Sequence, residues 1–341
     1  MPQKQRIIYL DIIRVMSCMM IVLMHSPHPD AGIPGFIQVP LSFLTATGIG
    51  LFFMVSGALL LPVKMETESF LKRRMGKIIS PLLFWTFFYI IVKLLMGEIS
   101  AYELPTMLLS IPFSTQGHGI LWFMYTLAGL YMLAPVLSPF LVKCSKRELD
   151  FYLLLWGIAL CYPLLCLFLD VNRSTTGMLY YFTGYVGYFI LGYYLHKYKP
   201  SLKPVTLASM IVIPLICLFV HNYYSMDGDF YDLFWYLSIF VVVMCVSWFV
   251  GLQHVGTLFP VGGGKFLTGF SNACFGIYLV HIFVMRRVLW NIDFLTYGFG
   301  WVGQLMTSWL MTLIISFALT WAISFIPYGE YIVGFTNRKI K

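Results

Sequence analysis

Long apolar stretches, separated by short polar segments, run through the whole chain. Ten of these stretches are about 17–25 residues long, the length of an α-helix that crosses the hydrocarbon core of a bilayer. Apolar and polar residues do not alternate within them, so the pattern predicts helices and not the strands of a membrane barrel. The predicted spans are Ile7–Ser26, Leu41–Leu61, Ile78–Met96, Ile120–Val142, Phe151–Leu169, Met178–Leu195, Val205–Val220, Leu233–Leu252, Phe266–Trp290 and Val302–Ile326.

The composition agrees with an all-α polytopic membrane helix bundle. Hydrophobic residues make up 60% of the 341 residues and charged residues only 11%, whereas soluble domains carry about 25% charged residues. This difference excludes an ordinary soluble enzyme. The loops between the predicted spans are short, so residues 1–341 are expected to form one membrane domain with no separate soluble domain.

The formal net charge of +8 comes mainly from one set of loops. If the N-terminus lies in the cytoplasm, most lysines and arginines fall in inner loops, as the positive-inside rule requires. The outer side then receives Arg173, Arg286 and Arg287, with Lys93 near the outer end of its span, while the outer loops carry mostly aspartate and glutamate. We therefore predict a multi-pass protein of the cytoplasmic membrane with both termini inside. The lipid bilayer is its expected partner, and nucleic acid is not.

Three ionisable residues, Asp11, Arg14 and His25, lie within or at the end of the first span. Such groups are costly in a bilayer and usually face a bundle interior or a cavity. Asp11 and Arg14 are three residues apart and can pair on one helix face. Arg14 and His25 are eleven residues apart, about three turns or 16 Å, which predicts one polar face from the cytoplasmic end to the outer end. Alternatively, Arg14 snorkels to the interface and His25 only ends the helix.

Motifs of several other chemistries are absent from the sequence. No C-x-x-C, H-E-x-x-H or closely paired histidines occur, so neither a zinc enzyme nor a metal cofactor is expected. No G-x-S-x-G motif occurs, which leaves a serine hydrolase without support. Any chemistry must therefore come from side chains of the bundle and its loops.

Five short motifs occur along the chain, each in or beside a predicted span. Any one of them is weak evidence, because apolar helices produce such strings by chance. Their order and spacing together are more specific. The motifs are Asp11-x-x-Arg14-x10-His25, Phe52-Phe53-Met54-Val55-Ser56-Gly57, Phe70-Leu-Lys72-Arg73-Arg74-Met-Gly-Lys77-Ile78 leading to Pro81, Leu121-Trp122-Phe123-Met124-Tyr125, and Phe275-Gly-Ile-Tyr278-Leu-Val-His281.

In this order, the motifs resemble those of the membrane acyltransferase-3 family over most of the chain. The resemblance implies an integral membrane O-acyltransferase, which moves an acyl group, often acetyl, from cytoplasmic acyl-CoA to an extracytoplasmic hydroxyl. The acceptor of such proteins is often a cell-envelope glycan. Two departures from the family pattern are Lys77 in place of a second arginine, and Ser80 before Pro81 in place of a first proline. Because lysine acts as a point charge, bidentate phosphate contact at Lys77 is in doubt.

The resemblance also implies roles for the charged residues. Arg73, Arg74 and Lys77 would bind the phosphates of acyl-CoA at the cytoplasmic mouth. Arg14, held by Asp11, would orient the donor or stabilise developing negative charge. The alternative for the three loop cations is that they only set the topology.

On the outer side, His25 is the expected general base or transient acyl carrier, because histidine suits proton transfer near neutral pH. Tyr278, His281, Trp122 and Tyr125 would line the acceptor side at a similar depth. The alternatives are that Trp122 and Tyr125 belong to an interfacial aromatic belt and that His281 is a packing histidine.

A secondary transporter or flippase of a small anionic or glycan substrate is the competing function. Arginine, aspartate and histidine within a membrane also suit proton-coupled transport. Against this function, the two halves of the sequence show no inverted repeat and no matching pair of broken helices. Release of CoA from acyl-CoA by the pure protein would separate the two functions.

Overall fold

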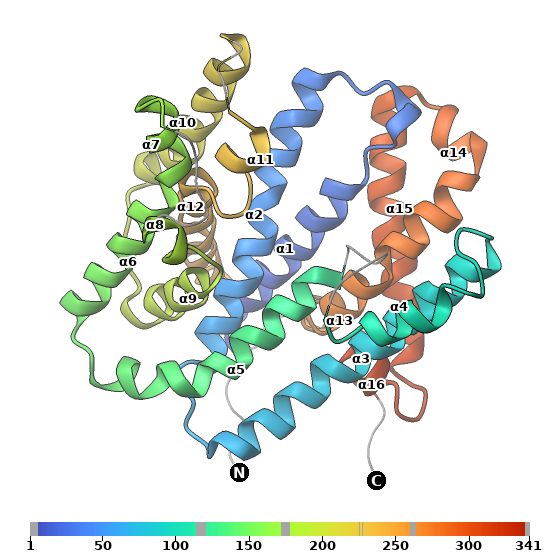
Figure 1. Ribbon diagram of the computed structural model, residues 1–341, viewed down its shortest axis with the longest axis horizontal. Helices are drawn as coiled ribbons and strands as arrows, with labels where there is room; N and C mark the ends of the chain where they lie inside the picture. The colour runs from blue at the N-terminus through green and yellow to red at the C-terminus, as the bar shows by residue number, and fades with distance from the viewer. Residues whose placement is uncertain are drawn as a thin grey trace.

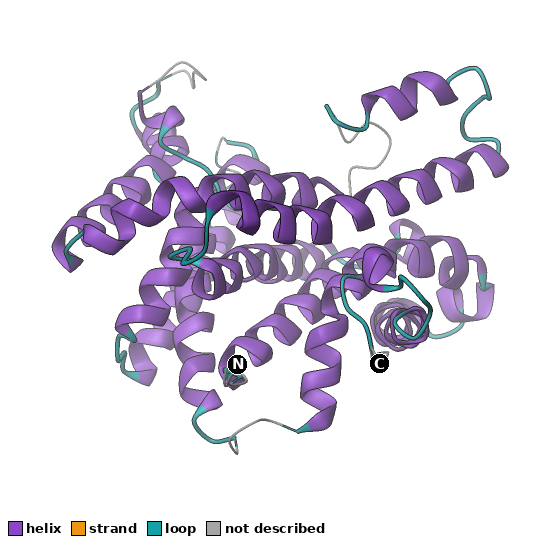
Figure 2. Ribbon diagram, turned by 90° about the horizontal axis from the view of Figure 1, so that it is seen from below, coloured by secondary structure: helices purple, strands orange, loops and turns teal. Residues whose placement is uncertain are grey.

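The computed structural model describes residues 6–113, 121–171, 178–224, 226, 228–259 and 264–337 (Figures 1 and 2). Within these ranges the chain is helical, with connecting loops and no strand. The predicted all-α polytopic bundle is therefore confirmed. Arg173 and Asp227, which the sequence placed in outer loops, lie outside the described residues.

Among the described residues, eight helices are long and apolar enough to cross a membrane. A bent pair, α6 (Lys146–Leu160) and α7 (Tyr162–Phe168), makes a ninth span if it is counted as one, with 45° between its halves. The eight are α1 (Ile8–His25), α2 (Gly35–Leu60), α3 (Thr67–Leu95), α5 (Trp122–Lys143), α10 (Pro204–Tyr223), α12 (Ile239–Gly256), α13 (Lys265–Ile282) with its continuation to Asn291, and α15 (Gly300–Ile323).

Shorter helices connect or cap these spans. A π-helix, η3 (Phe283–Val288), and a 3-10 turn, η4 (Leu289–Asn291), continue α13. The remaining short elements are η1 (Pro29–Ala31), α4 (Leu104–Ser110), α8 (Met178–Tyr181), α9 (Val186–Tyr198), α11 (Phe230–Leu233), α14 (Asp293–Tyr297) and α16 (Glu330–Val333).

The predicted span Met178–Leu195 is not one helix, and here the prediction is wrong. The chain breaks between α8 and α9 at Gly184, whose φ of +123° is incompatible with a right-handed helix. With 13 residues, α9 is shorter than the roughly 20 residues of a typical span. It still joins the two ends of the bundle, because Tyr185 at its start packs against Trp122 and His196 near its end bonds Tyr9.

Helices α1 and α2 lie at the centre of the bundle, with α6–α12 on one side and α13–α15 on the other (Figure 1). Helix α13 runs parallel to α1. Near their starts, Arg14 Nη1 donates to Ser271 Oγ at 3.1 Å, and at their ends the rings of His25 and His281 lie 5.2 Å apart. The predicted polar face of α1 therefore exists, and it faces α13.

Glycines allow α2 and α9 to cross with their backbones almost in contact. A Cβ atom on Gly57 would lie 1.8 Å from the carbonyl oxygen of Phe189, and one on Gly192 would lie 1.9 Å from that of Met54. Any larger residue would push the helices apart. The last residue of the Phe52–Gly57 motif thus has a packing role.

Polar side chains with a spacing of four follow α15, a helix that the sequence suggested only as an apolar span. All are buried, and small residues of this kind let membrane helices approach closely. The approach is close at Gly276 of α13, where a Cβ atom would lie 2.3 Å from Thr320 Cγ2. The stripe consists of Gln304, Ser308, Thr312, Ser316, Thr320 and, at its end, Ser324.

The two ends of the bundle differ in charge. We call the end at which α1 and α13 begin the basic end, because its described loops hold most of the lysines and arginines. The other end, the acidic end, carries Asp30, Glu98, Glu103, Asp170, Asp229, Asp232 and Asp293 in its described loops. This separation agrees with the predicted alternation of the spans. The assignment of the basic end to the cytoplasm stays a prediction.

Candidate active site

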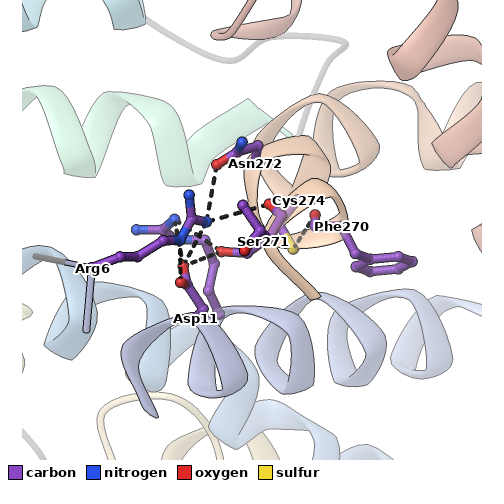
Figure 3. Close-up of polar contacts among 8 residues, drawn as sticks. Arg6, Asp11, Phe270, Ser271, Asn272 and Cys274 are labelled. Carbon is purple, nitrogen blue, oxygen red and sulfur yellow. Dashed lines mark hydrogen bonds and ion pairs between the residues drawn. The ribbon is translucent and has the colours of Figure 1, made fainter. Parts of the chain in front are cut away.

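A buried carboxylate organises the start of α1 (Figure 3). Asp11 is 6% exposed and accepts hydrogen bonds from Ser271 Oγ at 2.6 Å and from both Nε and Nη2 of Arg6. The predicted pair with Arg14 is present, with Nη1 at 3.7 Å from Asp11 Oδ1. Arg6, rather than Arg14, is nevertheless the main partner of this carboxylate.

Arg6 ties the segment before α1 to α13. Its Nη2 also donates to Asn272 Oδ1 at 3.1 Å and to the carbonyl oxygen of Thr268 at 3.3 Å. Since one carboxylate here faces two guanidinium groups, the cluster keeps a net positive charge. Arg14 can therefore act on an anion even while it stays close to Asp11.

A cavity of about 290 Å³, the basic-end cavity, opens beside this cluster. Its lining includes three cations, Arg14, Arg74 and Lys77, and no carboxylate among the described residues. Arg74 Nε is buried there without a hydrogen-bond partner. Because an unsatisfied buried donor is costly, this geometry favours a bound anion.

The predicted trio of donor-binding cations does not form one site. Arg74 and Lys77 line the basic-end cavity, whereas Arg73 is exposed and is not part of its lining. Helix geometry explains the division, because successive residues differ by about 100° whereas residues three apart share a face. In α3, only Arg74 and Lys77 can point into the same cavity.

A second cavity, of about 570 Å³, lies toward the acidic end. This acidic-end cavity brings together the predicted residues His25, Trp122 and Tyr278, which come from α1, α5 and α13. Further lining residues, which the sequence argument did not assign to the site, are Tyr89, Lys93, Tyr236, Arg286 and Arg287.

His25 presents a free nitrogen lone pair to this cavity. Its Nδ1 lies 2.8 Å from the carbonyl oxygen of Ile21, and because a carbonyl can only accept, Nδ1 is assigned the hydrogen. In the neutral ring Nε2 is then the acceptor. A hydroxyl that enters the cavity therefore meets a base already in the correct tautomer.

Two predicted acceptor-side residues lie elsewhere. His281 is fully buried and packs behind His25, with its Nδ1 2.6 Å from the carbonyl oxygen of Tyr278 and its Nε2 without a hydrogen-bond partner. Tyr125 lines neither cavity, and its hydroxyl donates to the carbonyl oxygen of Ile111 at 2.6 Å. The structure thus supports a packing position for both side chains rather than direct contact with an acceptor.

Tyr278 lines both cavities. Its ring packs against that of Phe123, with 5.3 Å between the centroids. On α13 and η3, one stripe with spacings of three and four residues passes from the basic-end cavity, through Tyr278, to the acidic-end cavity. The stripe consists of Ser271, Phe275, Tyr278, Ile282 and Arg286.

A family model described as an acyltransferase domain, that of acyltransferase-3, matches residues 7–328. The chain belongs to the acyltransferase-3 family. It is a multi-pass membrane protein and an acyltransferase. Comparison with curated proteins finds no match, and neither does comparison with solved structures.

The matched range includes all the residues that line the two cavities on α1, α2, α3, α5 and α13. The acyltransferase therefore has, within one family domain, a cationic cavity at one end, a histidine in a second cavity, and an aromatic partition between them. Acyl transfer between substrates that enter from opposite ends needs these three features.

Proposed function

We propose that this protein moves an acyl group, acetyl in the first instance, from cytoplasmic acyl-CoA to a hydroxyl of an extracytoplasmic cell-envelope glycan. The observation that carries the proposal is the pair of cavities that share Tyr278. One cavity suits a polyanionic donor, and the other presents a histidine lone pair to a hydroxyl. The basic end then faces the cytoplasm and the acidic end faces outward, in agreement with the positive-inside rule.

The donor would bind with its phosphates in the basic-end cavity. Arg74 offers an unpaired buried donor, and Arg14 and Lys77 add positive charge. Arginine binds phosphate in a fork, and lysine acts as a point charge, so the two residue types have different roles here. Such CoA binding needs no metal ion.

The arm of CoA would then extend along α13 past Tyr278. Eleven residues separate Arg14 from His25, a rise of about 16 Å in an α-helix, so an extended arm is required. Packed rings of Phe123 and Tyr278 form the partition, which favours a small acyl group such as acetyl.

Transfer would occur beside His25. The acceptor hydroxyl oxygen attacks the thioester carbonyl carbon, so that a C–O bond forms and the C–S bond breaks. His25 Nε2 takes the hydroxyl proton and returns it to the departing CoA thiolate. The rings of Trp122, Tyr236 and Tyr89 give a sugar flat apolar surfaces on which to stack.

Purified protein, given radiolabelled acetyl-CoA and cell-envelope glycan, tests this proposal. His25→Ala should lower acceptor-dependent transfer by about 10²–10⁴-fold, the usual contribution of a general base, while acetyl-CoA binding is kept. His254→Ala is the matched control, since this exposed histidine lies at the end of α12 outside both cavities. Transfer by His25→Ala at the parental rate would refute the assigned role, and absence of CoA release with every glycan would refute the activity.

A further inference from the structure

The acidic-end cavity has a charge opposite to that of its surroundings. Lys93, Arg286 and Arg287 line it together with His25, and no carboxylate does so among the described residues. These three are also all the lysines and arginines described at the acidic end, where the loops carry aspartate and glutamate. Every described cation of that end is therefore directed to one cavity.

The helix that forms the partition also positions these cations. Arg286 follows Tyr278 and Ile282 at intervals of four residues, which keeps all three on the cavity-facing stripe. Residues 283–288 form the π-helix η3, and π-helical turns occur mostly at functional sites. Arg286 is five residues beyond His281, whose ring touches His25, so its Cα lies about 7–8 Å farther along the axis by the α-helical rise.

The local charges do not cancel. Arg287 Nη2 pairs with Glu98 Oε1 at 2.5 Å, whereas the Arg286 guanidinium lies 5.7 Å from the ring of Trp290, a cation–π contact that leaves its charge in place. With three cations and one carboxylate, the group keeps an excess of two positive charges. Like charges gathered in one cavity are unfavourable unless an anion joins them.

Two ordinary explanations fit less well. Lysine and arginine at the end of a span commonly snorkel to lipid headgroups, but these side chains line a cavity beside a histidine. Topology signals would place positive charge at the other end. A bound anion accounts for both the position and the sign of the charge.

We propose that the acceptor is an anionic saccharide, one whose carboxylate or phosphate binds Arg286 and Lys93 while a hydroxyl of the same molecule reaches His25. This inference rests on the proposed function for the reaction, but not for the binding. Carboxylates and phosphates are the anions that arginine binds with two parallel hydrogen bonds. A neutral sugar could stack on the aromatic rings but would leave the cations without a partner.

Direct binding to the full-length purified protein tests the inference without any acyl transfer. Glucuronate, glucose 6-phosphate and glucose share one ring and differ in charge, and each is titrated while tryptophan fluorescence is followed. Trp122 lines the cavity and Trp290 lies beneath Arg286, so both report on its occupancy. At least one of the two anions should bind tenfold or more tightly than glucose. Selective binding of glucuronate identifies a carboxylate, and selective binding of glucose 6-phosphate identifies a phosphate.

Three variants show whether the cavity is responsible. Arg286→Gln should abolish the preference for the anion, a loss of about tenfold in affinity, the usual value of a charged hydrogen bond. Arg286→Lys, which keeps the charge, should retain part of the preference and rules out misfolding as the cause. Arg147→Gln, an exposed arginine at the start of α6, is the control and should bind like the parent. Equal affinity of the parent for glucose and both anions, or unchanged selectivity in Arg286→Gln, would overturn the inference.

Acyl transfer to envelope glycans, separated by ion exchange into neutral and acidic fractions, distinguishes this inference from the proposed function. Label from acetyl-CoA should enter the acidic fraction. Transfer mainly into the neutral fraction would refute the anionic acceptor and leave the acyltransferase proposal standing. Anion-selective binding without any CoA release would do the reverse.

Discussion

Replacing Arg74 with glutamine, beside the same change at Arg73, tests the donor site in adjacent residues. The two arginines have equal charge and lie in the same turn of α3, but only Arg74 lines the basic-end cavity, and its Nε is buried without a partner. Arg73 is exposed. A topology role would make the two changes equivalent, whereas a binding role makes them different.

The expected size of the effect follows from the contact that is lost. A hydrogen bond to a charged group contributes about 1.5–3 kcal/mol, so Arg74→Gln should weaken acetyl-CoA binding by roughly 10- to 150-fold. Arg73→Gln has no cavity contact to lose and should change the affinity less than about threefold, by long-range charge alone.

Isothermal titration of acetyl-CoA into detergent-purified parent and variants measures both effects. Unchanged melting temperatures show that both variants are folded. Titration in added salt is a further control, because screening should reduce any effect of the exposed Arg73 charge more than that of the buried Arg74 contact. Equal losses in the two variants, or a larger loss for Arg73→Gln, would refute the assignment of the basic-end cavity to the donor.

Three other changes test the cluster, the packing and the partition. Asp11→Asn should lower the melting temperature more than Arg14→Ala, because it leaves two guanidinium groups facing one another, whereas Arg14→Ala should reduce acetyl-CoA binding more; a ligand titration and a thermal melt of each variant compare them. Gly192→Ala should destabilise the bundle by about 1–3 kcal/mol, as its Cβ would lie 1.9 Å from a carbonyl oxygen of α2, while Gly129→Ala, with nothing within 4 Å, should not; equal melting temperatures would contradict this packing. Phe123→Ala should open the partition and raise transfer from butyryl-CoA relative to acetyl-CoA, and an unchanged ratio would show that these rings do not select the acyl group.

Spacing arguments succeed where two residues share one helix, because helical geometry then fixes their relation. Arg74 and Lys77, three residues apart, do line one cavity, and Asp11 and Arg14 do approach each other. The same arithmetic, applied strictly, also separates Arg73 from this pair. The span lengths were likewise sufficient to predict an all-helical membrane bundle.

Contacts between segments are beyond such arguments. Arg6 precedes α1, so no helical spacing links it to Asp11, although it is the main partner of that carboxylate. His281 lies at the predicted depth but on the face of α13 that packs behind His25, and depth alone could not reveal the face. A signal for the remaining residues did exist in the α13 stripe, since the intervals from Ser271 to Arg286 are all three or four residues.

The stripe on α13 also explains how one protein can join two aqueous sides without becoming a channel. Charges would hold each substrate at its own end: Arg14 and Arg74 the donor, and Arg286 the acceptor. Between them the stripe is aromatic, and Tyr278 packs on Phe123 where the two cavities meet. A charged phosphate or a hydrated ion loses too much solvation energy to pass such rings, whereas a thioester with a short acyl chain carries no charge. The partition would therefore select the acyl end of the donor by its polarity as well as by its size, and would bring it to His25 at the acidic-end cavity.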